Sequence, residues 1–290
     1  MVVTRRVLLG GAAGALAGCA PGAVEGPSGA ATSGPASPSG TPSGAPSMTD
    51  LPTPVLRLAA ASDLHYGEHG TDYDQFATEL IERLNAQHAA TPLDLVVLNG
   101  DLAHEAEWLA PLRDLLKGVQ PRLLPVQGNH DGATEQQWRD LWGHGFNHTV
   151  SANGVRIIAA GTSNAAGDYL CADGAWLTEQ LDAAGDAPVI VAFHITPRTW
   201  TKWGIDCPAT VELLGRYRNV AAVLNGHDHD EAGVKTAEGV PYLFDGHAGG
   251  HWGTTFRGFR VVELYPDGRI ETWVTDGTSV HGSDSLPPRR

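Results

Sequence analysis

The sequence predicts a layered α/β fold in which mixed β-sheets lie between helices. Five apolar runs of strand length recur between residues 55 and 224, and amphipathic helical patterns separate several of them. These runs are continuous rather than alternating, which is typical of strands that are buried on both faces in a sheet covered by helices. Residues 55–282 therefore form one block of ordinary size for a single α/β domain, with a short C-terminal tail at 283–290.

Each expected element follows from its local pattern. Continuous apolar runs predict strands at residues 55–61, 93–98, 122–126, 188–193 and 220–224. Helical spacing of apolar residues predicts helices at 73–87, 108–117, 175–184 and 210–217. Shorter stretches predict antiparallel strands at 146–152, 155–161, 240–245, 256–265 and 269–275. The last two are joined by the hairpin signal Pro266-Asp267-Gly268. Together these elements predict two mixed sheets with helices outside them.

Residues 1–19 are typical of a bacterial export signal. Arg5 and Arg6 precede an apolar run to Gly18 that is too short to span a bilayer. Twin arginines ahead of such a run predict export by the twin-arginine (Tat) route. Leu16-Ala17-Gly18-Cys19 resembles a lipobox, in which Cys19 is the lipidated residue. The alternative is that Cys19 belongs to a discarded peptide.

Residues 20–54 consist almost wholly of Gly, Pro, Ser, Ala and Thr, without a periodic apolar pattern. Such a segment buries too little apolar surface to offset its ordering entropy, so we expect a disordered tether. A tether behind a lipidated cysteine predicts a domain held at the extracytoplasmic face of the cell membrane. The only contact expected with the membrane is this lipid anchor.

The charge of the chain limits its partners. The formal net charge is −14, with only three lysines and no basic stripe. This balance argues against a nucleic-acid polymer as partner. It remains compatible with a small phosphoester, because bound cations would dominate the local field. Besides Cys19 the chain has Cys171 and Cys207, and both a single disulfide and two free thiols are open.

Seven residues of metal-ligand type occur in five short motifs, each directly after an expected strand. They are Asp63 and His65 in Asp-Leu-His, Asp101 in Gly-Asp, Asn129 in Gly-Asn-His-Asp, the lone His194, and His227 and His229 in Gly-His-Asp-His. Open α/β sheets bind ligands at the carboxyl ends of their strands, where all five motifs fall. Carboxylate, imidazole and amide oxygen suit Fe, Mn or Zn rather than Ca, and no thiolate is among them. A single histidine of this kind is more often structural than a ligand, but the ordered set predicts a metal site.

This order of motifs resembles the calcineurin-like metallophosphoesterase superfamily over the whole block from Asp63 to His229. Within it, the spacing is most similar to the bacterial cyclic-nucleotide and glycerophosphodiester phosphodiesterase group. The resemblance implies a four-layer αββα sandwich and two metal ions. It assigns one metal to Asp63, His65 and His229, the other to Asn129, His194 and His227, and a bridging position to Asp101. His130 matches the catalytic histidine of the family, with Asp131 orienting its ring.

The implied reaction is hydrolysis of a small phosphodiester by in-line attack of a hydroxide shared between two cations about 3.5–4 Å apart. Two alternatives stay open: a cell-surface phosphomonoesterase, and a non-catalytic binding lipoprotein that retains the fold. Ile195 follows His194 where the diesterase group often has a second histidine, so monoesters remain possible substrates. The oligomeric state is not determined by the sequence.

The segment 196–203 after His194 contains two Trp and two of the few cations. One interpretation is a pocket wall in which Trp200 stacks an aromatic group and Arg198 pairs with a phosphate. The other is a surface loop that covers the helix behind it. Three further histidines are interpreted as non-ligands. His247 and His251 are expected to be loop residues near the pocket, and His104 a helix-start residue, although its place three residues after Asp101 could also direct it at the site.

Overall fold

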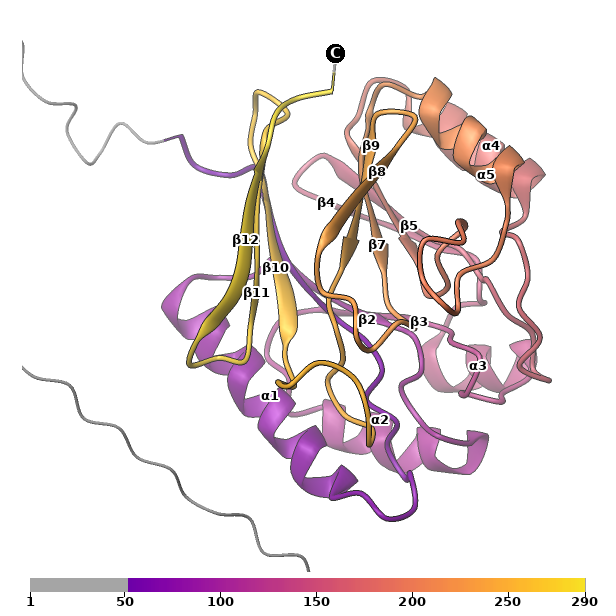
Figure 1. Cartoon of the computed structure of the whole chain (residues 1–290), viewed down its shortest axis with the longest axis vertical. Coiled ribbons are helices and arrows are strands. Elements are labelled where there is room, and N and C mark those ends of the chain that lie inside the picture. Colours follow the sequence, from indigo (N-terminus) through magenta and orange to yellow (C-terminus); the bar gives the residue numbers. More distant parts are fainter. Residues whose placement is uncertain (1–51, 290) are drawn as a thin grey trace, which may run out of the picture. The chain divides into compact units, whose positions relative to one another are not determined.

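The computed structural model describes residues 52–289 (Figure 1). The expected export signal, Cys19 and nearly all of the expected tether lie outside the described residues, as does residue 290. Within the described part, no helix is both long enough and apolar enough to cross a membrane.

The first of two six-stranded sheets has the order β12-β11-β10-β1-β2-β3. β1 (Leu56–Ala61), β2 (Leu95–Asn99) and β3 (Leu123–Val126) run parallel. β10 (Phe259–Leu264), β11 (Ile270–Thr275) and β12 (Val280–Leu286) extend the sheet on the other side of β1, each antiparallel to its neighbour. The sheet is therefore mixed, as the sequence predicts.

The second sheet has the order β4-β5-β6-β7-β9-β8. Its centre is parallel and consists of β5 (Val155–Ala159), β6 (Val189–Phe193), β7 (Val220–Asn225) and β9 (Val240–Phe244). The antiparallel edges are β4 (His148–Ala152) and β8 (Val234–Ala237).

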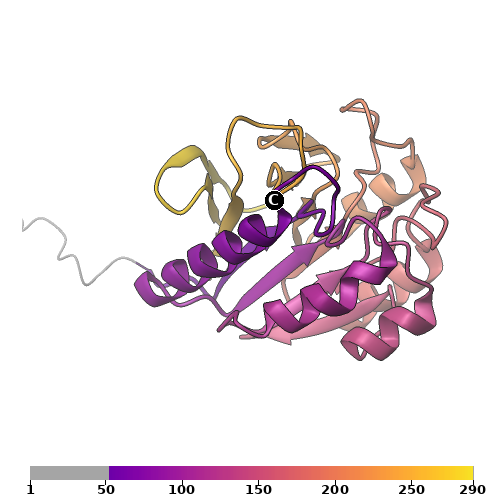
Figure 2. The same ribbon diagram turned by 90° about the horizontal axis from the view of Figure 1, so that it is seen from below.

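Helices cover the outer face of each sheet and complete a four-layer αββα sandwich (Figure 1). On the first sheet lie α1 (Tyr73–Ala90), a 3₁₀ turn at Ala106–Trp108 leading into α2 (Leu109–Leu116), and α3 (Glu135–Trp142). On the second lie α4 (Gly174–Ala184) and α5 (Pro208–Arg216). Figure 2 shows α1 and α2 running along the same face of the first sheet. A third apolar cluster fills the space between the two sheets, so the strands are buried on both faces and read as continuous apolar runs.

The expected helices and the five motif-bearing strands are confirmed, and four features differ from expectation, one of them the unexpected edge strand β8. β9, expected to be antiparallel, pairs parallel with β7 and antiparallel only with β8. β12 carries the sheet to Leu286, past the expected domain end at 282, and its mostly exposed polar residues give no apolar pattern. α3 was not expected, although a capping box formed by Thr134 and Gln137 starts it.

Candidate metal centre

The seven expected ligands meet where the parallel strands of both sheets end. Asp63 and His65 follow β1, Asp101 follows β2 and Asn129 follows β3. His194 follows β6, and the Gly-His-Asp-His motif follows β7. The structure brings six of these seven side chains into two buried clusters, one of Asp63, His65 and His229 and the other of Asp101, His194 and His227. Within each cluster the possible ligand atoms lie within 4.8 Å of one another. Asn129 is half-buried beside them.

Asp63 and Asp101 each accept a backbone hydrogen bond with one carboxylate oxygen and face the histidines of a cluster with the other. Asp63 Oδ2 accepts a hydrogen bond from the backbone N–H of His227 (2.8 Å), and its Oδ1 lies 3.2 Å from His229 Nε2. Asp101 Oδ1 accepts from the backbone N–H of His130 (2.7 Å). Asp101 Oδ2 lies 3.2 Å from His194 Nε2 and 3.7 Å from His65 Nε2. Asp101 thus reaches one histidine of each cluster, the position that a bridging ligand requires.

Backbone carbonyls fix the orientation of two of the imidazoles. His194 Nδ1 lies 2.8 Å from the carbonyl oxygen of Asn99, and His229 Nδ1 lies 3.1 Å from that of Trp252. A carbonyl can only accept, so both Nδ1 atoms donate and both Nε2 atoms are left to face the clusters. Metal-binding histidines are typically held in this way by a partner on the other ring nitrogen.

The side chains at this site fit a pair of cations. Among the side chains of the expected ligands, four buried atoms have no hydrogen-bond partner: Asp63 Oδ1, Asn129 Oδ1, His194 Nε2 and His227 Nε2. Buried polar atoms are normally paired, and these four belong to the expected ligand set. Oxygen and imidazole nitrogen ligands without thiolate suit Fe, Mn or Zn. The two clusters together therefore provide the donors of a dimetal centre.

Without metal, burial and the attraction between neighbouring side chains shift the pKa values of the aspartates and histidines in different directions. Burial alone would raise the pKa of Asp63 and Asp101, but the neighbouring histidines outweigh it and hold both pKa values below the usual range. Burial disfavours a charged His194, yet attraction to Asp101 and Asp63 raises its pKa to about 10. Burial lowers the pKa of His65 and of His227 to about 4. Cations bind imidazole nitrogen only after its proton has left, so loading this site releases protons.

Left-handed backbone conformations are concentrated at the candidate ligands. Asp63, His65, Asp101 and His227 have φ values of 56°, 47°, 49° and 69°. Only two other non-glycine residues in the described part of the chain have positive φ. Each such conformation costs on the order of 1–3 kcal/mol and persists only where the surrounding structure enforces it. The sharp turns after β1, β2 and β7 are therefore held by the rest of the fold.

Gly128 allows the β3 loop to approach Asp101. A Cβ atom at this position would lie 2.1 Å from the Asp101 backbone nitrogen and 2.2 Å from its Oδ1. We expect Gly128→Ala to displace Asp101, to lower the free energy of unfolding by about 1–3 kcal/mol and to reduce the bound metal. Thermal unfolding and elemental analysis of the purified variant measure both effects.

The matched control is Gly174→Ala at the start of α4, where an added Cβ meets nothing within 4 Å. This control should keep the wild-type melting temperature and metal content. If Gly128→Ala behaves in the same way, close approach at residue 128 does not position Asp101.

A cavity of about 250 Å³ opens above the two clusters. Its lining consists of His65, Asp101, His130, His227 and His229, with Tyr169, Trp203 and Trp252 around them. The expected catalytic residue His130 is exposed, and its ring lies 4.8 Å from that of His65, centroid to centroid. His104, for which a helix start was favoured over a place at the site, stacks on His130 at 5.2 Å, and its Nδ1 lies 3.4 Å from His65 Nδ1. His65, His104 and His130 also lie close enough together to hold an ion.

Asp131 does not orient the ring of His130 in this structure. Its carboxylate is buried and accepts hydrogen bonds from the backbone N–H groups of Ala103 (2.9 Å) and Gly128 (2.8 Å). Burial and repulsion from Asp101 raise its pKa to about 7. Its short side chain thus joins the loops after β2 and β3, and Asp131 acts on the site by positioning them.

The expected substrate contacts of Arg198 and Trp200 are not formed at the cavity. Trp200 packs against the core behind the second sheet, with its ring 5.1 Å from that of Tyr242. The Arg198 guanidinium lies 5.5 Å from the Trp200 ring. Neither residue lines the cavity, whereas Trp203 from the same segment does.

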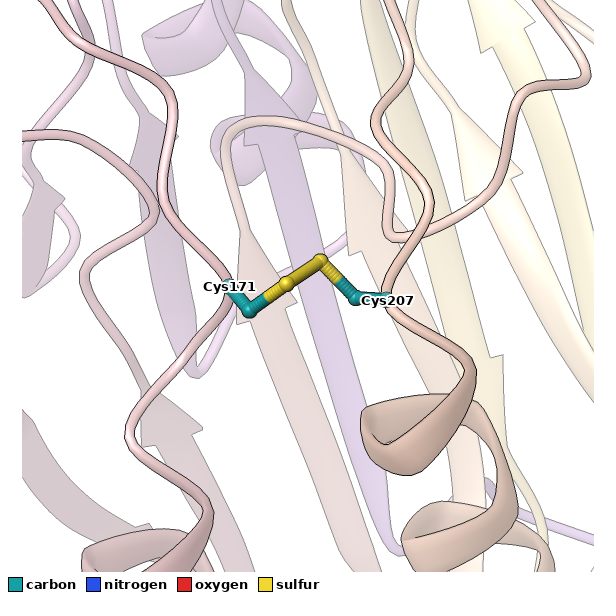
Figure 3. The surroundings of a disulfide bond; sticks show 2 residues. All are labelled: Cys171 and Cys207. Atoms are coloured by element: carbon teal, nitrogen blue, oxygen red, sulfur yellow. A yellow bond between two sulfur atoms is a disulfide. The ribbon is translucent and has the colours of Figure 1, made fainter.

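A disulfide joins Cys171 and Cys207 and resolves the alternative that the sequence leaves open (Figure 3). Their Cα atoms are 5.7 Å apart. Cys171 lies in the loop between β5 and α4, and Cys207 directly precedes α5. The bond therefore connects two loops that both contribute to the cavity lining.

Tyr169 and Trp252 are site residues that no sequence motif predicts. Each lies in a loop that leaves the carboxyl end of a strand, β5 for Tyr169 and β9 for Trp252. Their proximity in sequence to Cys171 and to the Gly-rich run 246–253 is the only local signal. That signal becomes specific only once the loops have been placed around the metal ligands.

Residues 56–231, which include all of the motifs, match the family profile of the calcineurin-like phosphoesterases. The chain belongs to the calcineurin-like phosphoesterase family. Among curated protein sequences none matches this phosphoesterase. The sequence resemblance is thus confirmed for the family, together with its αββα fold.

Solved structures with the same fold are distant from this calcineurin-like phosphoesterase in sequence. A dimetal phosphatase from Danio rerio is 14% identical, with 81% of this chain and 99% of that chain covered and a TM-score of 0.63. GAP50, the anchor in the inner membrane complex of Plasmodium, is 15% identical, with 81% and 89% covered and a TM-score of 0.61. A purple acid phosphatase from yellow lupin seeds is 14% identical, with 80% and 53% covered and a TM-score of 0.57. At these identities the similarity establishes the fold.

Metal removal should destabilise this phosphoesterase, because Asp63 and Asp101 are buried carboxylates that lie close together. A cation present at one hundred times its dissociation constant contributes about 2.7 kcal/mol to stability. For a domain of this size, that corresponds to a fall in melting temperature of roughly 5–10 °C after chelation. Scanning calorimetry before and after EDTA, and after added Mn²⁺, measures the change. A melting temperature that changes neither after EDTA nor after added Mn²⁺ would contradict metal binding at this site.

Proposed function

We propose that this protein hydrolyses small phosphodiesters at a dimetal centre. The observation that carries the proposal is that six of the seven expected ligands form two buried clusters, and that four of the seven line one cavity together with His130. Within the family, the spacing of the motifs favours the bacterial cyclic-nucleotide and glycerophosphodiester phosphodiesterase group.

Metals bound to the two clusters would supply an activated water and neutralise charge on the phosphoryl oxygens. The contribution of His130 follows from its position. Its backbone N–H is held by Asp101, while its side chain is exposed beside His65. From this position the imidazole would donate a hydrogen bond to the phosphoryl group and a proton to the leaving oxygen.

The charge of the cavity favours a diester over a monoester. None of the described residues that line it is Lys or Arg, and Asp101 contributes a negative charge. A phosphomonoester carries about −1.5 to −2 charges at neutral pH because its second pKa is near 6, whereas a diester carries one. A singly charged diester therefore requires less compensation from the protein.

The test is hydrolysis of bis(p-nitrophenyl) phosphate and of p-nitrophenyl phosphate by the purified chain, loaded with Mn²⁺ or stripped of metal. We expect metal-dependent turnover with a higher kcat/KM for the diester. A preference for the monoester would instead assign a phosphatase activity, as in the names of the Danio rerio and lupin proteins. No turnover of either substrate with metal bound would favour the binding role, for which GAP50 provides a structural parallel.

We also propose that the protein is exported by the twin-arginine route and anchored through a lipid on Cys19. The twin arginine, the lipobox-like Leu16-Ala17-Gly18-Cys19 and the segment 20–54 support this location. A disulfide at Cys171–Cys207 suits an oxidising compartment. We expect Cys19→Ser to move the protein from the membrane fraction to the soluble fraction. Membrane attachment that persists in this variant would exclude the lipid anchor.

A further inference from the structure

Three aromatic side chains surround the mouth of the metal cavity and are exposed to solvent. In residues 52–289, six large hydrophobic side chains are exposed, and three of them are aromatic: Tyr169 (37%), Trp203 (38%) and Trp252 (37%). All three line the metal cavity. Exposed apolar side chains that gather at one concave site mark a binding surface. We call these three residues the aromatic wall.

Contacts with the metal motifs hold two members of the aromatic wall in place. The ring of Tyr169 meets that of His227 edge-on, with centroids 4.8 Å apart and an interplanar angle of 89°. The ring of Trp252 stacks on that of His229, at 4.2 Å and 7°. Both rings are therefore oriented by two of the expected metal ligands.

Trp203 is fixed by a different set of contacts. Two residues before it, the Thr201 hydroxyl donates to Asp228 Oδ2 (2.9 Å), and Asp228 lies between the two histidines of the Gly-His-Asp-His motif. One residue after it, the Gly204 backbone N–H donates to Thr201 Oγ1 (3.1 Å). The Lys202 ammonium lies 4.2 Å from the centroid of the Trp203 ring. The loop is thus held to the metal motif while the indole stays at the mouth of the cavity.

We propose that the aromatic wall binds a flat, uncharged ring of the substrate, so that this site selects phosphoesters of an aryl alcohol or a nucleoside. This inference rests on the proposed phosphoesterase function for the location of the phosphoryl group. Stacking on an aromatic side chain tolerates any flat ring because each has a π-face. No Lys or Arg is among the described lining residues, so a second anionic group on the same ester would meet only the Lys202 ammonium, which lies against the Trp203 ring.

The disulfide gives the aromatic wall part of its geometry. Tyr169 is two residues from Cys171, and Trp203 is four residues from Cys207, so the bond connects the two loops that carry these rings (Figure 3). Of the expected metal ligands only His194 lies in either loop, at the end next to β6 and far along the loop from Cys207. We therefore assign a positioning role to Cys171 and Cys207 that affects ring recognition more than metal binding.

The test compares phenylphosphonate with methylphosphonate, two probes of the same charge type that differ in the ring. Their dissociation constants are measured by calorimetry on the Mn²⁺-loaded full chain. We expect phenylphosphonate to bind about 10- to 100-fold more tightly, the range for one aromatic stacking contact. Trp203→Ala should remove most of this preference at unchanged metal content. The exposed Leu115 on α2 provides the control, because Leu115→Ala removes an apolar side chain away from the cavity and should retain the preference.

Equal affinities for the two probes in the wild-type chain, or binding of neither, would overturn the proposal that the aromatic wall binds a ring of the substrate. So would a preference that survives Trp203→Ala and Tyr169→Leu together. Replacement of both cysteines by serine should reduce the preference without loss of metal, and an unchanged preference would remove their positioning role. Turnover of bis(p-nitrophenyl) phosphate is scored separately. Turnover without ring preference defeats this inference alone, whereas ring preference without turnover defeats only the proposed hydrolysis.

Discussion

Replacement of Asp101 by asparagine is expected to lower kcat/KM for the diester by about 10³-fold or more and to release metal from both clusters. Metal ions contribute several kcal/mol of transition-state stabilisation, and each 1.36 kcal/mol is a factor of ten in rate. Asparagine has the shape of aspartate and can still accept from the His130 backbone N–H. It lacks the negative charge that Asp101 presents to His194 and His65. The change therefore removes charge with little change in packing.

Elemental analysis and steady-state kinetics on the same preparation distinguish the possible results. Asp114→Asn is the control, because Asp114 is an exposed carboxylate on α2 that pairs with Arg113 and Lys117. This control should retain full activity and metal. A variant Asp101→Asn with two metals and wild-type kcat/KM would exclude the bridging assignment.

Replacement of His130 by glutamine is expected to lower kcat by about 10²–10⁴-fold, the usual contribution of a general acid or base. Metal content should not change, because His130 is exposed and belongs to neither of the two buried clusters. Glutamine keeps a hydrogen-bond donor at this position but cannot transfer a proton at neutral pH. The loss should therefore appear in kcat rather than in KM.

The competing possibility for His130 is that it binds metal together with His65 and His104, which lie close to it. Loss of metal in His130→Gln would establish that role and exclude the general-acid assignment. His148→Gln is the control, since His148 lies in β4 and stacks on His144 away from the cavity lining. It should leave both kcat and metal content at wild-type values.

The metal ligands were predictable because parallel strands place their carboxyl ends at one edge of a sheet. Asp63, Asp101 and His194 each follow a strand whose apolar run is visible in the sequence. The residues after neighbouring parallel strands meet within one sheet, and the packing of the two sheets against each other brings His194 to Asp63 and Asp101. The same reasoning could not place β8 or β12, because their residues are partly or largely exposed and lack an apolar pattern.

The roles of Asp131 and His104 could not be predicted from the sequence pattern. Asp131 has the residue type of a histidine-orienting acid, but two backbone amides occupy its carboxylate. His104 has no motif around it, yet the turn after β2 brings it against His65 and His130. Both outcomes depend on backbone positions that several segments set together.

The sequence by itself determined the family, the αββα layering and the seven candidate ligands, because strand burial and motif order are local properties of the chain. Only the tertiary structure decided which side chains surround the metals. The aromatic wall depends on loops joined by the Cys171–Cys207 disulfide and on the Thr201–Asp228 hydrogen bond. These contacts join residues far apart in the sequence, and loop conformation follows from such contacts rather than from the local pattern.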